Sequence, residues 1–172
     1  RYPQRDPIDD LMPWNKDYTN SMRKVLANNP SDLDVQTVFV ESIMNETPWK
    51  MWDLKTGGVA EDAGTSEARE ILETSFRDVP ESWDHPGLLH LYVHLMEMSP
   101  FPKLALRAGD RLRELVPESG HLIHMPTHID VLCGNYRDVV VYNQKATVAD
   151  RKFLEREGAM NVYAMYRTHN YH

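Results

Sequence analysis

The chain has 172 residues and a net charge of −7 with histidine neutral. That length fits about one domain and can bury a real core. Hydrophobic residues make up 41% of the sequence and charged residues 26%, both ordinary for a soluble globular protein. Lysine and arginine are scattered rather than clustered, which disfavours nucleic acid as the main partner. The single cysteine, Cys133, excludes an internal disulfide framework.

Nothing in the sequence indicates insertion into a membrane. No apolar stretch approaches the roughly 18 to 20 residues that span a bilayer, and no signal peptide is visible at the start. We therefore expect a soluble protein with no membrane partner, in a compartment that the sequence does not specify. The sequence stops at His172, inside a group of histidines. We interpret 1–172 as a single helical-repeat domain within a longer chain.

Apolar residues at helical spacing predict one helix after another along the chain. The predicted helices cover 17–29, 33–46, 66–79, 86–98, 103–115, 120–132, 136–152 and 155–172. Between the second and the third, residues 47–64 contain Pro48 and three glycines and are predicted to form an inserted loop. No run of alternating β-branched residues has the pattern of a strand. The expected fold class is all-α.

Two of these helices carry a residue that interrupts them. Pro126 lies inside 120–132, removes one backbone hydrogen bond and is predicted to kink that helix. Gly158 is predicted to interrupt 155–172. Ser31-Asp-Leu-Asp is a good N-terminal signal for the helix predicted over 33–46.

The helices recur with a period typical of stacked repeats. Residues 134–146, Gly-Asn-Tyr-Arg-Asp-Val-Val-Val-Tyr-Asn-Gln-Lys-Ala, resemble the turn and second helix of a tetratricopeptide repeat, and 68–80 and 105–117 are similar to the same frame. The resemblance covers 17–150 and implies a right-handed α-solenoid of helix-turn-helix repeats. The chain is also similar to a poorly characterised group of proteins that combine such repeats with a His-Met-Pro-x-His segment, here 124–128.

All eight histidines fall into three groups, and two of the groups repeat. The groups are His85, His90 and His94; His121, His124 and His128; and His169 and His172. His90 and His124 are 34 residues apart, and so are His94 and His128, which places two His-x-x-x-His pairs in register. Residues four apart share one face of a helix and can chelate one ion. Imidazole is the commonest metal ligand in proteins, so the pattern favours a metal site.

The repeat resemblance implies where these histidines meet. In tetratricopeptide folds the first helices of successive repeats line a concave groove, with neighbouring axes about 8–10 Å apart. The first-choice ligands are His90, His94, His124 and His128, joined by His172 or His169, with His121 on the same stripe as a further ligand. All-histidine ligation favours copper or zinc. An ion with an open coordination position would make the protein a metal-dependent oxidase or hydrolase, with catalytic residues unknown.

Two acidic residues are candidates to support the ligands. Glu41 lies near the expected groove face and is either a second-shell partner of a histidine or an ordinary solvated glutamate. Asp130 either orients a histidine or faces water.

Two further readings of the sequence remain open. The chain could be a repeat scaffold that binds a protein or peptide in its concave groove or assembles with itself, with histidines that serve packing or partner recognition. Alternatively, a closed metal site could staple adjacent repeats together without catalysis.

Overall fold

The computed structural model describes residues 12–158 and 160–171 and is built of helices. Within these residues no β-strand forms, and the only β-type pairing is an isolated bridge between Trp52 and Val59. The predicted all-α class is therefore confirmed. Contacts divide the chain into two compact units, Arg1–Pro80 and Glu81–His172.

Between residues 12 and 80 the first unit has three helices that pack in sequence order, α1 on α2 and α2 on α3. They are α1 (Met12–Asn28), α2 (Leu33–Met44) and α3 (Thr65–Asp78). Helix α1 begins earlier than predicted, because Pro13 falls in its first turn, where a missing N–H costs little. Helix α2 begins in the predicted Ser31-Asp-Leu-Asp segment, where Asp32 is the cap: its carboxylate accepts a hydrogen bond from the backbone N–H of Val35 at 3.1 Å. Phe39 and Leu72 are fully buried between these helices.

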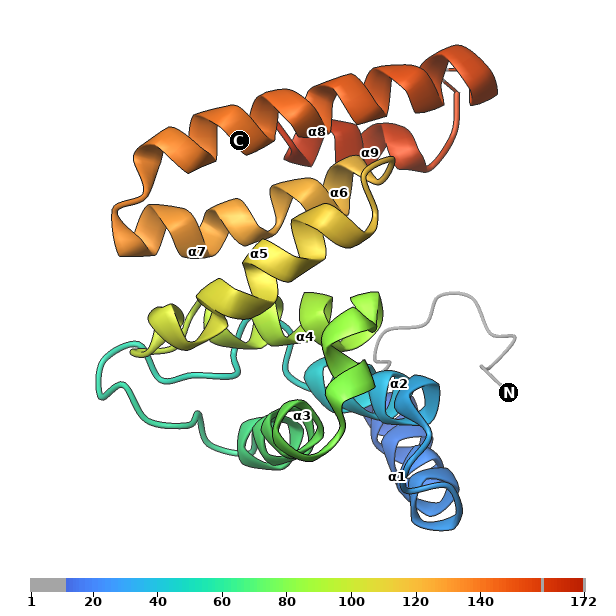
Figure 1. The fold of residues 1–172 in the computed structure, drawn as a ribbon. Coiled ribbons are helices and arrows are strands. Elements are labelled where there is room, and N and C mark those ends of the chain that lie inside the picture. Colours follow the sequence, from blue (N-terminus) through green and yellow to red (C-terminus); the bar gives the residue numbers. More distant parts are fainter. Residues whose placement is uncertain (1–11, 159, 172) are drawn as a thin grey trace. The chain divides into compact units, whose positions relative to one another are not determined.

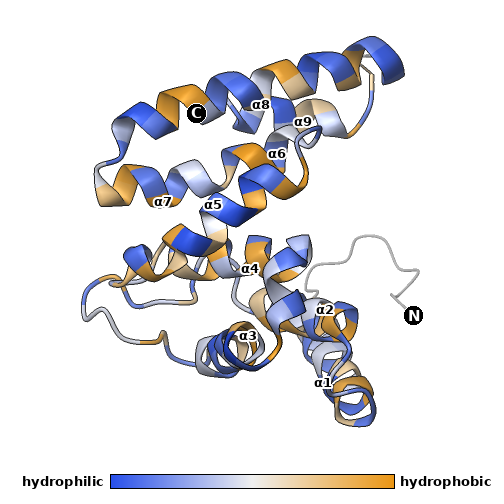
Figure 2. Ribbon diagram, in the orientation of Figure 1, coloured by the Kyte–Doolittle hydropathy of each residue, from blue (hydrophilic) through white to orange (hydrophobic). Residues whose placement is uncertain are grey.

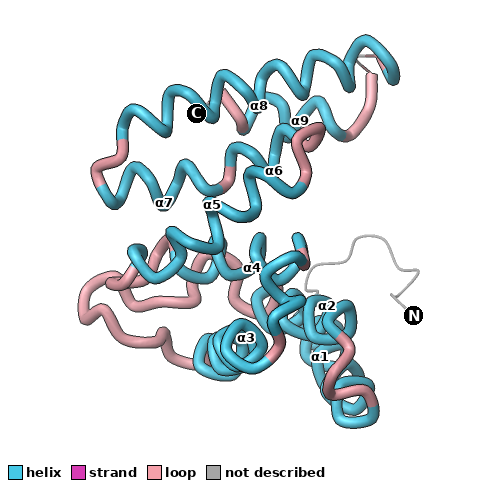
Figure 3. The backbone as a smooth tube through the Cα atoms, viewed as in Figure 1, coloured by secondary structure: helices cyan, strands magenta, loops and turns pink. Residues whose placement is uncertain are grey.

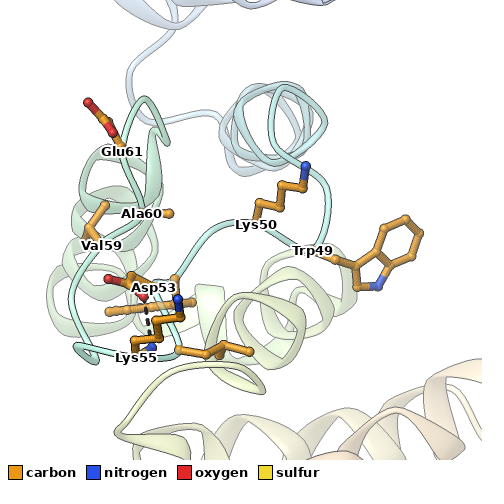
Figure 4. Close-up of a pocket in the computed structure, with 9 residues that line it drawn as sticks. Trp49, Lys50, Asp53, Lys55, Val59, Ala60 and Glu61 are labelled. Carbon is orange, nitrogen blue, oxygen red and sulfur yellow. Dashed lines mark hydrogen bonds between the residues drawn. The ribbon is translucent and has the colours of Figure 1, made fainter.

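The long connection between α2 and α3 contains no helix and is plain in the tube view (Figure 3). Asp53 organises its tip, because its carboxylate accepts hydrogen bonds from the backbone N–H of Lys55 and the hydroxyl of Thr56. The loop surrounds an open hollow shown in Figure 4, where the Trp49 ring points away from the other labelled side chains. No histidine lines this hollow.

The described residues of the second unit form six α-helices and a 3₁₀ turn, and a further 3₁₀ turn, η1 (Pro80–Asp84), leads into it. The elements are α4 (Pro86–Met96), the 3₁₀ turn η2 (Pro102–Ala105), α5 (Leu106–Leu115), α6 (Gly120–His124), α7 (Pro126–Cys133), α8 (Tyr136–Glu157) and α9 (Tyr163–His169). Helix α8 ends at Gly158, which has a positive φ of 79°. Neither α8 nor any other helix in the described ranges is both long and apolar enough to cross a membrane.

Helix α4 is the centre of the second unit. It packs against α5, η2 and α7. Val93, Met96 and all of its leucines are buried, and together they cover most of the circumference of the helix. A helix that is apolar around most of its circumference belongs in a core. The burial fixes the rotation of α4 and so sets the direction in which His90 and His94 project.

The helix predicted over 120–132 is broken in two at Met125, as the position of Pro126 predicted. The break lies where α5 comes closest, because a methyl group added at Gly109 would stand 3.0 Å from the Cβ of Pro126. The small residue at 109 and the proline therefore allow α5 and α7 to pack tightly.

Helix α9 is held mainly by polar contacts, because none of its own residues is buried. Asp150 on α8 is buried and accepts hydrogen bonds from the Tyr163 hydroxyl at 2.7 Å and from the side-chain amide of Asn170 at 2.9 Å. Gly120 leaves room for this carboxylate, since an added Cβ would lie 2.0 Å from it. Figure 1 shows α9 beside α6 and α8.

We predict that Asp150→Ala releases α9. The substitution leaves the buried Asn170 amide without its carboxylate, which should lower the free energy of unfolding by about 1–3 kcal/mol. Hydrogen exchange should lose protection over 163–169 while α4 stays protected. The exposed Glu155→Ala change on the same helix is the control and should stay within about 0.5 kcal/mol of wild type. Unchanged exchange over α9 in Asp150→Ala would contradict the anchoring role.

Candidate metal centre

Six histidines of the second unit gather into two groups of three. His90, His94 and His121 form the first triad, and His124, His128 and His169 form the second. Within each triad, one ring nitrogen from every histidine lies within 4.8 Å of the others. The ligands come from α4, α6, α7 and α9, so the site depends on all four helices.

The first triad joins α4 to α6. His90 and His94 stand one turn apart on α4, with ring centroids 4.6 Å apart. The Nε2 atoms of His90 and His121 lie 3.2 Å apart. The other ring nitrogen of His121, Nδ1, is buried and has no hydrogen-bond partner among the described residues.

The second triad joins α6, α7 and α9. The Nε2 atoms of His124 and His128 face each other at 3.0 Å. His169 packs its ring against both, with centroids 4.7 Å from His124 and 5.5 Å from His128. The Nδ1 of His124 lies 2.7 Å from Oδ1 of Asn143 on α8, and the hydroxyl of Thr127 donates to the same oxygen. Since that oxygen is an acceptor, His124 carries its hydrogen on Nδ1 and a lone pair on Nε2.

One carboxylate connects the two triads. Glu97, just after α4, accepts a hydrogen bond from Nδ1–H of His94 at 3.1 Å and another from Nδ1–H of His128 at 2.5 Å. Its side chain is only 13% exposed. Both histidines therefore carry their hydrogen on Nδ1 and present Nε2 for ligation.

Burial favours the neutral form of three rings in the cluster, and hydrogen bonds favour the charged form of its carboxylate. Burial lowers the pKa of His90 and of His121 to about 3, helped by neighbouring histidines, and burial lowers the pKa of His124 to about 4. Burial by itself raises the pKa of Glu97, but hydrogen bonds from His128 and His94 outweigh it and bring the pKa down to about 2. Near neutral pH His90, His121 and His124 are therefore neutral and Glu97 is ionised, and these are the forms in which such side chains bind a metal ion.

The histidines that the sequence analysis singled out lie at different places relative to the two triads. His90, His94, His124 and His128 do gather, but in two triads, with His121 completing the first and His169 the second. His172 lies outside the described residues. His85 stands apart from both triads as the cap of α4, where its Nδ1 accepts from the backbone N–H of Leu88 at 3.3 Å.

Glu41 and Asp130, which were predicted as possible partners of the histidines, lie in other environments. Glu41 is exposed on α2, in the first unit. Asp130 is buried, but its carboxylate accepts from Arg113 at 2.9 Å and from Asn135 at 3.3 Å. Because the Arg113 pair ties α7 to α5, Asp130 supports the scaffold of the site and not the rings themselves.

Sequence reasoning missed the two residues that do orient histidines, Glu97 and Asn143. Glu97 could have been found, because it stands three residues after His94 and so on the same helical face. Asn143 could not, since its contact with His124 depends on how α8 packs against α6.

One pair of ring nitrogens in each triad has the spacing of two ligands on a tetrahedral metal ion. With metal–nitrogen bonds of about 2.0–2.1 Å, two ligands at a tetrahedral angle are about 3.3 Å apart. The Nε2 pairs at 3.2 Å and 3.0 Å are close to this spacing. Imidazole ligands suit zinc, copper, iron and nickel, so the donor set alone does not choose among these metals.

No family model matches this chain, and neither does any curated protein or any solved structure. The resemblance to tetratricopeptide repeats therefore remains a prediction from the sequence.

The lowered pKa values predict that the metal-free protein loses stability in mild acid. The ordinary histidine pKa is 6.5 and those of His90, His121 and His124 are about 3 to 4, so between these limits the unfolded chain binds more protons than the folded one. This contribution is complete above pH 6.5 and is lost as pH falls; Glu97 adds a loss in the same direction below pH 4.5.

Urea unfolding of the metal-free protein at a series of pH values measures the effect. The midpoint should be level above about pH 7.5 and fall steadily from pH 6.5 to 4. In His90→Ala/His124→Ala the fall should be shallower, because two of the three shifted groups are gone. A wild-type midpoint that holds level down to pH 4 would be the contrary result.

Proposed function

We propose that this protein binds two transition-metal ions, copper or zinc, one in each histidine triad. One observation carries the proposal most directly. The Nε2 atoms of His124 and His128 both bear lone pairs, since Asn143 and Glu97 hold the hydrogens on the opposite nitrogens. Two lone pairs at 3.0 Å repel unless a cation lies between them. A proton would bridge two nitrogens only, whereas His169 supplies a third, so a metal ion suits the arrangement better.

The number of ligands in each triad favours a catalytic site over a structural one. Three histidines leave one position of a tetrahedral ion free for water or substrate, which is typical of catalytic rather than structural sites. His94 and His128 are 28% and 32% exposed, so small molecules can reach the rings. With copper the pair of sites suits an oxidase, and with zinc it suits a hydrolase.

The finer fold forms part of the same proposal. Helices α4 and α5 form one pair, and α6–α7 with α8 form the next, with α7 packed on α4 and α5. A right-handed tetratricopeptide-like solenoid has this order of contacts, and it would set the ligand-bearing helices α4 and α6–α7 side by side.

Metal analysis of protein purified without a histidine tag tests the proposal. Inductively coupled plasma mass spectrometry should find about two ions of copper or zinc per chain in the wild type. His90→Ala and His124→Ala should each retain about one ion, and the double variant none. His85→Asn is the matched control: it changes a histidine outside both triads, and asparagine caps helices well.

Two outcomes would change the proposal. Wild-type protein that takes up no metal after loading with copper and with zinc would refute it and leave a scaffold whose histidines serve packing or partner recognition. If the metal is present but its removal by a chelator unfolds α4–α8, the ions act as a structural staple. An open catalytic site predicts retained helical circular dichroism after chelation.

A second candidate function, self-assembly, rests on the surface of α8. Tyr136, Val140 and Val148 are 67%, 57% and 54% exposed and follow one side of the helix. Figure 2 shows hydrophobic residues recurring along α8. Apolar stripes of this kind mark interaction surfaces. Sedimentation velocity should then detect a dimer that Val140→Glu dissociates without loss of metal, and a wild type that sediments as a monomer at all concentrations would exclude it.

A further inference from the structure

The carboxylate of Glu97 contacts both triads and determines which ring nitrogen of His94 and of His128 carries the hydrogen. Each oxygen accepts from one histidine, Oε1 from Nδ1–H of His94 and Oε2 from Nδ1–H of His128. A carboxylate is one of the few side chains that accept at two positions and donate at none. Both rings are thereby forced into the same tautomer, with Nε2 available to a metal.

His128 has a nearby acceptor that would stabilise its alternative tautomer, in which the hydrogen is on Nε2. If its hydrogen moved to Nε2, that group would donate to the lone pair of His124 across the 3.0 Å separation. This hydrogen bond would replace a repulsion, and it would also occupy the two nitrogens that the second triad offers to a metal. The second triad is therefore competent only while something holds the hydrogen of His128 on Nδ1.

We propose that Glu97 is the positioning residue that keeps the second triad open to metal, by fixing the tautomer of His128. The proposal rests on the metal-binding function above and adds a mechanism of control at the same site. Glu97 is not itself a ligand in this arrangement, because both of its oxygens face ring N–H groups.

Glu97→Gln separates this role from a general effect of charge. The glutamine oxygen can accept from His94, while its amide N–H donates to Nδ1 of His128, whose hydrogen then moves to Nε2 and bonds to His124. Loss of one negative charge would weaken both triads alike, whereas a change of tautomer disables the second triad alone. Glu97→Asp keeps two acceptor oxygens and should restore binding there.

Zinc titration in backgrounds with one triad each provides the measurement. His90→Ala leaves the second triad and His124→Ala leaves the first. We expect Glu97→Gln to weaken zinc binding about 10- to 100-fold in the His90→Ala background, and to change it less than threefold in the His124→Ala background. Glu155→Gln is the control. It also removes one negative charge, but at an exposed position on α8, and it should alter the zinc affinity of neither background.

Nitrogen NMR of the histidine rings in the metal-free protein gives a second readout that does not depend on zinc. Wild-type His128 should carry its hydrogen on Nδ1, and in Glu97→Gln the hydrogen should be on Nε2. Equal weakening of both triads, no weakening of either, or an unchanged His128 tautomer in Glu97→Gln would each overturn the role of Glu97. Absence of zinc binding in the wild type and in both single-triad backgrounds would instead overturn the proposed function.

Discussion

The hydrogen bonds from His94 and His128 to Glu97 are the interactions on which the rest of the histidine cluster depends. They hold two rings in one tautomer and place a single negative charge among partly buried imidazoles. Near neutral pH, burial keeps His90 neutral and these hydrogen bonds keep Glu97 ionised. A group of donors with this distribution attracts a cation and offers it lone pairs, which is the chemical basis for proposing a metal centre.

Three different structural features position the helices that carry these rings. Helix α4 is oriented by apolar burial around most of its circumference, which fixes His90 and His94. The break at Pro126 ends α6 just after His124 and begins α7, which carries His128 of the same triad, while His121, also on α6, joins the first triad. Helix α9 brings His169 through buried polar contacts with Asp150. The first triad therefore rests on the hydrophobic core, and the second rests partly on a polar anchor that is easier to release.

Much of the fold and part of the site could be predicted from the sequence. Helical periodicity and the prolines predicted a helix in each region where the described residues form one, because both act locally. Some bounds were wrong: α1 begins at Met12 rather than at 17, and α8 runs to Glu157 across the predicted gap between 152 and 155. The repeated His-x-x-x-His pairs identified side chains that the structure brings close together. Their sorting into triads was not predictable, since ring contacts such as that of His90 with His121 depend on the packing of α4 against other helices. Asp130 illustrates the limit: its partner is Arg113, on a helix that no local pattern relates to it.

The arrangement sets stability against metal binding. Facing lone pairs on His124 and His128 and a buried Nδ1 of His121 that has no partner among the described residues both cost the metal-free fold free energy. An apolar core of the same volume would avoid these costs. A ligand that binds only the folded chain offsets them in proportion to the logarithm of its concentration over its dissociation constant. Under the proposed function, the polar cluster is costly on its own and becomes favourable once a cation is bound. That contrast supports the proposal that its histidines serve metal binding rather than packing.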